Sequence, residues 1–209
     1  MKKYLSVLLL LVLPLLCMGQ GRIYTRSARL ADFRSRTTKI VLTGDPGRDA
    51  VLKEEIASRW RISPYEFCSQ AEYESWKTSK LYYFLHVVSD AQFNYLMLTK
   101  GGPADDPDPL IEAMDVIDIP IGTAGEASEQ ELDHLAAYID IVQEYLLKAL
   151  TSEGTAYRGL KSVVHHRYGF HVEEFYIEPA PGARKPFRYR MKIDTRTHHL
   201  YGIRKERIR

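Results

Sequence analysis

VLTGDPGRDAVLKEEI, residues 41–56, runs from the end of an apolar segment through a glycine-rich turn into the start of a helix. The β-branched run at residues 39–43 is typical of a buried strand. Asp45 and Pro46 are suited to the N-cap and the first position of a helix. Leu52, Ile56 and Trp60 follow at four-residue spacing and give that helix one apolar stripe. The stretch therefore predicts a strand followed directly by a helix that packs on it.

The turn lacks the features of a phosphate-binding loop. A Walker loop ends in Lys followed by Ser or Thr, whereas Gly47 is followed by Arg48 and Asp49. The dinucleotide-binding pattern requires a third glycine, which is missing here. Asp45 and Asp49 also place negative charge at the helix N-terminus, where they would repel a phosphate. We therefore predict no nucleotide site, and no cofactor of another kind is indicated.

The segments on either side extend this unit into an α/β fold with a mixed sheet of about five or more strands and flanking helices. Apolar runs predict further strands at residues 64–69, 80–89, 93–101 and 114–122. Only three residues separate the middle two, which predicts an antiparallel hairpin. Pro120 favours an edge position or a strand end for the last of them. A short helix is expected at residues 71–77, with Tyr73 and Trp76 facing inward.

A long helix is predicted after the fifth strand. Ser128 and Glu131 have the spacing of a capping box. From Leu132 to Ala149, apolar residues recur at alternating three- and four-residue intervals, and the helix is expected to end near Gly154. The seam covers only about three heptads, so packing on the sheet is favoured over a coiled coil.

The N-terminus has the three parts of a secretory signal peptide. Lys2 and Lys3 precede an apolar run at residues 5–16, and small residues stand before a cleavage point at Gln20. The run is shorter than the roughly 20 residues that span a bilayer. We therefore predict a signal peptide at 1–19, a basic N-terminal arm at 20–38, an α/β domain at 39–153, and a β-rich C-terminal segment at 154–209. This last segment is expected to pack on the sheet or extend it.

Charge and cysteine content limit the kinds of partner and of chemistry that we expect for this protein. Removal of residues 1–19 leaves 27 basic and 27 acidic residues. This even balance argues against nucleic acid as a partner. Cys68 would then be the single cysteine, so no internal disulfide is possible, and its place in an apolar strand favours core packing over a nucleophilic role. The basic arm is either a solvated or loosely docked segment or a contact for an anionic surface.

No motif in the sequence identifies catalytic residues, and whether the protein is an enzyme stays open. One candidate metal site consists of His165, His166, His171 and Glu173, because imidazoles and a carboxylate ligate zinc. His171 and Glu173 would share one face of a strand. The competing interpretation is that these residues are ordinary surface side chains, since no His-x-x-x-His pair occurs on a helix.

The signal peptide, the strands "KIVLTGD", "YEFCS" and "YYFLHVV", and the helix "AAYIDIVQEYLLKAL" resemble a group of uncharacterised exported proteins of Bacteroidetes-type bacteria. The resemblance covers most of the chain and carries over no site residues. It implies export to the periplasm or the cell surface. We expect a non-enzymatic binding or assembly role, with another envelope protein or an anionic surface component as partner and no transmembrane segment after cleavage. The alternative is an exported hydrolase, with or without a metal ion.

Overall fold

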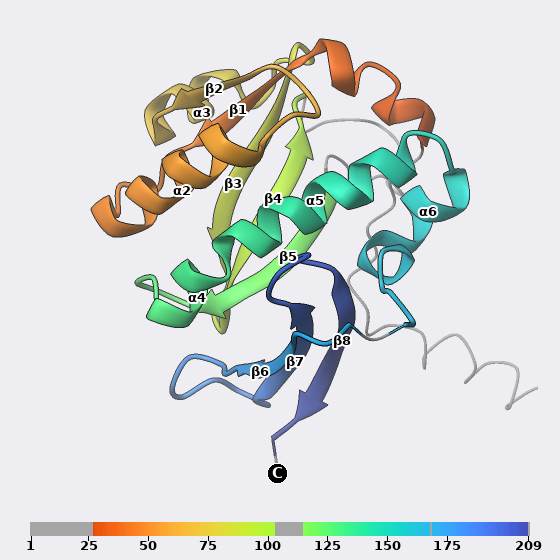
Figure 1. Cartoon of the computed structure of the whole chain (residues 1–209). Coiled ribbons are helices and arrows are strands. Elements are labelled where there is room, and N and C mark those ends of the chain that lie inside the picture. Colours follow the sequence, from red (N-terminus) through yellow and green to blue (C-terminus); the bar gives the residue numbers. More distant parts are fainter. Residues whose placement is uncertain (1–26, 103–114, 168, 209) are drawn as a thin grey trace, which may run out of the picture.

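The computed structural model describes residues 27–102, 115–167 and 169–208. The predicted signal peptide lies outside these ranges. Two sheets and their helices form the described part of the chain (Figure 1). No described helix is long and apolar enough to cross a membrane. The predicted α/β class, with a mixed sheet of five strands, flanking helices and a β-rich C-terminal part, is confirmed.

Sheet A is the larger sheet. Its strands lie in the order β2 (Tyr65–Cys68), β1 (Thr37–Val41), β3 (Tyr82–Ser89), β4 (Phe93–Lys100) and β5 (Asp115–Thr123). The strand β1 is parallel to both β2 and β3, and the β3–β4 and β4–β5 pairs are antiparallel. The predicted hairpin is therefore confirmed, and β5 with its Pro120 lies at a sheet edge.

The opening stretch forms β1, the turn and helix α2 (Pro46–Arg59). Asp45 caps this helix, because its Oδ1 accepts hydrogen bonds from the backbone N–H of Gly47 at 2.9 Å and of Arg48 at 3.1 Å. Asp49 reaches back to accept from the backbone N–H of Thr43 at 2.8 Å. The amide donors that a phosphate would need are thus bonded to the chain's own carboxylates.

Helices α2 and α5 (Leu135–Ala149) cover one face of sheet A (Figure 1). The predicted long helix is broken, because α4 (Glu129–Asp133) ends at His134, where α5 begins on a new axis. The predicted capping box is also only half formed. The Ser128 hydroxyl accepts from the Glu131 N–H at 3.1 Å, but the Glu131 side chain turns into the core.

Glu131 belongs to a buried polar network instead. Its Oε1 accepts from Arg48 Nε at 2.7 Å, and its Oε2 accepts from Asn94 Nδ2 at 3.1 Å. Arg48 also donates to the carbonyl of Gly125 at 3.1 Å. This network joins the first turn of α2, strand β4 and helix α4. Gly122 packs directly against the Glu131 carboxylate.

The other face of sheet A is partly covered by helix α3 (Gln70–Trp76). Tyr73 and Trp76 pack on Val41, Cys68 and Phe84, as the sequence predicts. The helix starts at a complete capping box, in which Ser69 and Glu72 bond each other's backbone N–H groups.

The C-terminal segment forms a second sheet. Sheet B contains β6 (Val172–Ile177), β7 (Phe187–Asp194) and β8 (Leu200–Arg207), all antiparallel and in that order. Helix α6 (Glu153–Arg158) and the 3₁₀ turn η4 (Gly159–Ser162) lead into it. The inner face of sheet B joins the main core through residues such as Phe175, Met191 and Ile193. The segment therefore packs on the body and does not extend sheet A.

The start of the described chain is built into the core. The 3₁₀ turns η2 (Ser27–Leu30) and η3 (Phe33–Ser35) bury Leu30 and Phe33 completely. Asp32 accepts a hydrogen bond from the Tyr83 hydroxyl at 2.7 Å. The described part of the predicted arm is thus docked on the body, and its burial of Leu30 and Phe33 is tighter than loose docking implies.

Candidate functional site

The turn between β7 and β8 is held rigidly by Asp194. The Asp194 Oδ1 accepts from the backbone N–H groups of Arg196 and Thr197, both at 2.9 Å. These bonds to the backbone of Thr197 and Arg196 hold the pKa of the Asp194 carboxyl below its ordinary value. At the end of the turn, His198 adopts a positive φ of 57°. The turn therefore presents His198 and His199 in a fixed arrangement.

Two carboxylates of α5 face this turn, one helical turn apart. His198 Nδ1 lies 2.7 Å from Asp140 Oδ2, which also accepts from Arg59 at 2.9 Å. His199 Nδ1 lies 3.5 Å from Glu144 Oε2. Consecutive histidines of the turn thus meet consecutive carboxylates of the helix, and sheet B is anchored to α5 at this point.

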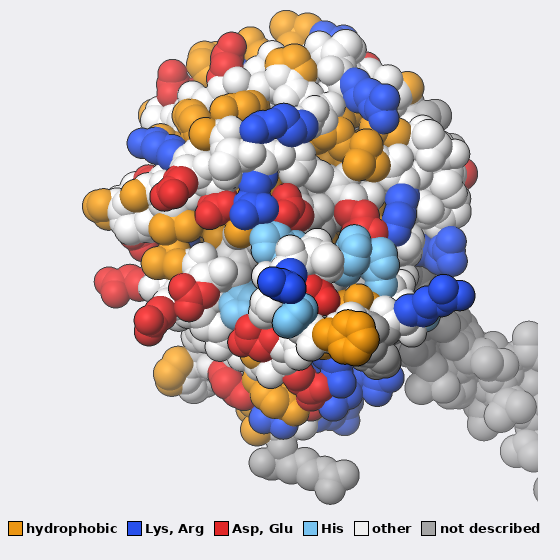
Figure 2. Space-filling view, in the orientation of Figure 1, with side chains coloured by type: hydrophobic (Ala, Val, Ile, Leu, Met, Phe, Trp, Pro, Cys, Tyr) orange, Lys and Arg blue, Asp and Glu red, His pale blue; other side chains and the backbone are white. Residues whose placement is uncertain are grey.

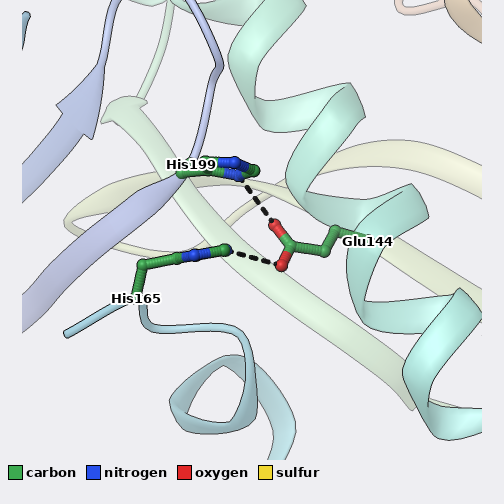
Figure 3. A group of neighbouring side chains, drawn as sticks. All are labelled: Glu144, His165 and His199. Atoms are coloured by element: carbon green, nitrogen blue, oxygen red, sulfur yellow. Dashed lines mark hydrogen bonds and ion pairs between the residues drawn. The ribbon is translucent and has the colours of Figure 1, made fainter. Parts of the chain in front are cut away.

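His165 completes a group that we name the histidine cluster: Glu144, His165 and His199 (Figure 3). The His165 backbone N–H donates to the carbonyl of Leu200 at 2.8 Å, which fixes this loop residue beside the start of β8. Its Nε2 lies 2.7 Å from Glu144 Oε1. The two imidazole rings are stacked, with 3.9 Å between centroids and 22° between planes.

Glu144 is the centre of this cluster. Lys148, one turn further along α5, donates to Glu144 Oε1 at 2.6 Å. Burial alone would raise the pKa of the Glu144 carboxyl, but hydrogen bonds from Lys148 and His165 outweigh it and lower that pKa below its ordinary value. Glu144 is therefore ionised at neutral pH.

The four residues of the predicted metal site do not meet in one place. His165 belongs to the histidine cluster, whereas His166 is exposed in the next position. His171 contacts Arg196 at 3.2 Å, and Glu173 pairs with His134 at 3.4 Å. Among the described residues, Glu144, His165 and His199 are the group whose possible ligand atoms converge.

Sequence reasoning missed Glu144 and His199 because they are 21 and 34 residues away from His165. Only the packing of sheet B on α5 brings the three together. The local signal was weak: a pair of carboxylates four residues apart on one helix, and a His-His pair just before a strand.

A second feature lies on the outer face of sheet B, which points away from the core. Here a depression of about 260 Å³, which we name the basic hollow, is lined by Arg190, Lys192, Tyr201, Gly202 and Arg204. Gly202 lies directly opposite Lys192 on the neighbouring strand and has no side chain to fill the space. Figure 2 shows basic side chains gathered on the C-terminal sheet, below the histidines.

The charges around the hollow are unevenly matched. Arg190 and Arg204 lie directly opposite each other on β7 and β8, an arrangement of like charges that destabilises an antiparallel pair. Arg190 forms ion pairs with Glu206 at 3.0 Å and with Glu174 at 3.6 Å, and Glu174 also pairs with Lys192. Arg204 is exposed and makes no ion pair with another residue that the structure describes.

The excess of basic residues around the hollow also appears in the sequence when charged residues are counted separately in each segment. Residues 154–209 contain 13 Lys and Arg against 5 Asp and Glu, whereas residues 20–153 contain 14 against 22. The even balance of the whole chain therefore conceals a basic C-terminal part and an acidic body.

Cys68 is buried, and burial raises the pKa of its thiol to about 11. It is thus a core residue without the thiolate that a nucleophile needs.

Comparisons with known proteins found no matching family model, no matching curated protein and no matching solved structure. The resemblance to exported proteins of Bacteroidetes-type bacteria therefore stays an expectation, and arguments about function depend on the geometry of the chain itself.

Proposed function

We propose that the protein is a non-enzymatic binding protein that holds an anionic group of another molecule in the basic hollow. The observation that carries this proposal is the pairing of Arg190 with Arg204 across a depression whose floor is Gly202. Glu206 and Glu174 already pair with Arg190, so the positive charge left for a bound anion is mainly that of Arg204. A bound anion would give Arg204 the counter-charge that it lacks among the described residues.

The chemistry of the hollow favours a group with several oxygen atoms. Arginine presents a planar fork of donors that fits phosphate or carboxylate oxygens two at a time. The volume of about 260 Å³ is smaller than the roughly 300–1,000 Å³ of pockets that enclose drug-sized ligands. We therefore expect one phosphate-bearing headgroup or a terminal unit of a longer polymer, with the remainder in solvent.

The expected partner is an anionic component of the cell envelope. Export, predicted from the signal peptide, would place the protein beside phospholipid headgroups and charged surface polymers. A lipid phosphate and a soluble phosphate share the chemistry that the hollow recognises, so an experiment has to separate these two sources.

Arg204→Ala tests the hollow directly, and Arg207→Ala is the matched control. Both changes remove one exposed arginine from β8, but Arg207 lies on the opposite face of the strand. Gly202→Val is a third variant, which keeps every charge and fills the floor with a strand-favouring side chain. Binding of tripolyphosphate is measured by calorimetry, and binding to vesicles with and without anionic lipid by sedimentation.

Loss of a charged hydrogen bond costs about 1.5 kcal/mol, so Arg204→Ala is expected to weaken binding about tenfold. Gly202→Val should weaken it at least as much, and Arg207→Ala should leave it within about twofold. Preference for vesicles over tripolyphosphate would assign the lipid as the source. Equal losses in Arg204→Ala and Arg207→Ala, or tight binding of a DNA oligonucleotide that ignores both changes, would overturn the proposal.

A hydrolase is the second candidate function, and the histidine cluster is the observation that favours it. Two imidazoles, a carboxylate and nearby solvent are the components of metal-assisted hydrolysis. The test is hydrolysis of p-nitrophenyl phosphate and p-nitrophenyl acetate with added Zn²⁺. A rate that disappears in Glu144→Gln would support this candidate, and a rate equal to that of free Zn²⁺ would remove it.

A further inference from the structure

The histidine cluster gathers three possible metal ligands from three separate elements. Glu144 comes from α5, His165 from the loop that follows η4, and His199 from the β7–β8 turn, and their ligand atoms all lie within 4.8 Å of one another. Figure 3 shows both imidazole rings directed at the same carboxylate. Each of the three side chains is held by structure that does not depend on the cluster: a helix, a backbone hydrogen bond to Leu200, and the Asp194 turn.

One distance in the cluster already matches the spacing of two ligands around a shared ion, and a second, which is now a hydrogen bond, is close to it. Zinc binds imidazole nitrogen and carboxylate oxygen at about 2.0–2.2 Å, so two ligands of a tetrahedral ion lie about 3.3 Å apart. His199 Nδ1 lies 3.5 Å from Glu144 Oε2, which is long for a hydrogen bond and close to this ligand spacing. His165 Nε2, at 2.7 Å from Glu144 Oε1, needs to move by less than about 1 Å.

Anchoring sheet B to α5 does not explain the cluster. His198 and Asp140 already make a short contact at 2.7 Å between the same turn and the same helix. His165 and His199 add two stacked imidazoles on one further carboxylate, which this anchoring does not require.

Lys148 is the competitor for such an ion. Its ammonium group contacts the carboxylate oxygen that also faces His165. The Lys148 side chain is 42% exposed and extends from the helix towards solvent, so it can leave the carboxylate at little cost. The ligand side chains are themselves 20–41% exposed, which leaves room for a water molecule as a fourth ligand.

From these observations we propose that Glu144, His165 and His199 form a binding site for one divalent transition-metal ion of the Zn²⁺ class. This site is separate from the basic hollow, and neither proposal depends on the other. The set of two histidines and one carboxylate favours Zn²⁺, Co²⁺ or Ni²⁺ over Mg²⁺ and Ca²⁺, which prefer oxygen ligands alone.

The test uses the full chain without a histidine tag, after removal of metal by chelation. Zn²⁺ binding is measured by calorimetry at pH 7.5, and Co²⁺ binding by the visible absorption of a tetrahedral site. His199→Ala and Glu144→Gln remove ligands. His166→Ala is the matched control, because it removes an exposed histidine one position from His165. Lys148→Ala removes the competing cation and leaves all three ligands.

We expect one Zn²⁺ per chain, a loss of affinity of about a hundredfold in His199→Ala, and wild-type affinity in His166→Ala. Lys148→Ala is expected to raise the affinity about twofold or more, a gain that a poorly folded variant would not give. The proposal is overturned if His199→Ala binds Zn²⁺ as the wild type does, if Lys148→Ala weakens binding, or if Mg²⁺ binds as tightly as Zn²⁺.

Discussion

The stability of the body is expected to be sensitive to the loss of either partner in the buried pair of Arg48 and Glu131. Their side chains are 8% and 1% exposed, and the Nε–Oε1 distance is 2.7 Å. Glu131→Gln keeps the shape and an acceptor for Asn94 but leaves the arginine charge buried without a counter-charge. Loss of one partner of a buried pair costs about 3–5 kcal/mol. Since Arg48 retains its bond to the Gly125 carbonyl, we expect a loss of about 3 kcal/mol.

The assay is urea unfolding of the wild type, Glu131→Gln, Arg48→Met and the double variant. The free energy lost in the double variant should be smaller than the sum of the two single losses by about 2 kcal/mol, because the second change removes a charge that the first left unpaired. Glu129→Gln, an exposed position on the same short helix, should change stability by less than about 0.5 kcal/mol. Additive losses, or a Glu131→Gln variant as stable as the wild type, would refute the reasoning that this pair locks α2 to α4.

Three further predictions concern residues in the interior of the protein. Burial lowers the pKa of His86 to about 4 from 6.5, so below pH 6.5 the unfolded chain takes up a proton that the native state does not, and about 3 kcal/mol of stability is lost by pH 4. Urea titrations at pH 7, 5.5 and 4 should show that His86→Leu loses less stability than the wild type over this range; equal losses would contradict the assignment. Gly122→Ala places a methyl group against the Glu131 carboxylate, which is held by Arg48 and Asn94. The free energy of unfolding, measured with urea, should fall by about 1–3 kcal/mol. An unchanged free energy would mean that Glu131 moves freely. Burial raises the thiol pKa of Cys68 to about 11. At pH 8, iodoacetamide should therefore alkylate Cys68 at least about a hundredfold more slowly in the native chain than in urea. Peptide mass spectrometry measures the two rates, and similar rates would contradict the burial of this thiol.

The parts of the fold that the sequence predicts are those with local causes. The Asp45 cap, the β3–β4 hairpin and the edge position of Pro120 each depend on residues within a few positions of one another. The break at His134 could not be predicted, because the apolar seam continues through it. Glu131 has the spacing of a capping residue, but a partner 83 residues earlier, Arg48, draws its side chain into the core.

The candidate sites depend on tertiary structure to different degrees. The histidine cluster joins three elements that only the docking of sheet B on α5 brings together, so no sequence pattern contains it. The basic hollow has a local signal in the sequence, since Arg188, Arg190 and Lys192 recur at every second position of the segment that forms β7. Its opposing row, with Arg204 across from Arg190, requires the β7–β8 register.

The separation of charge between the acidic body and the basic C-terminal part has an effect at long range. A molecule with little net charge but opposite excesses in its two parts has a large dipole moment, and a charged surface exerts a torque on it before contact. Close to an anionic membrane, the protein would rotate so that sheet B leads and the body trails. The approach would thus be oriented by the field alone, and this preference would fade as the Debye length shrinks with rising salt.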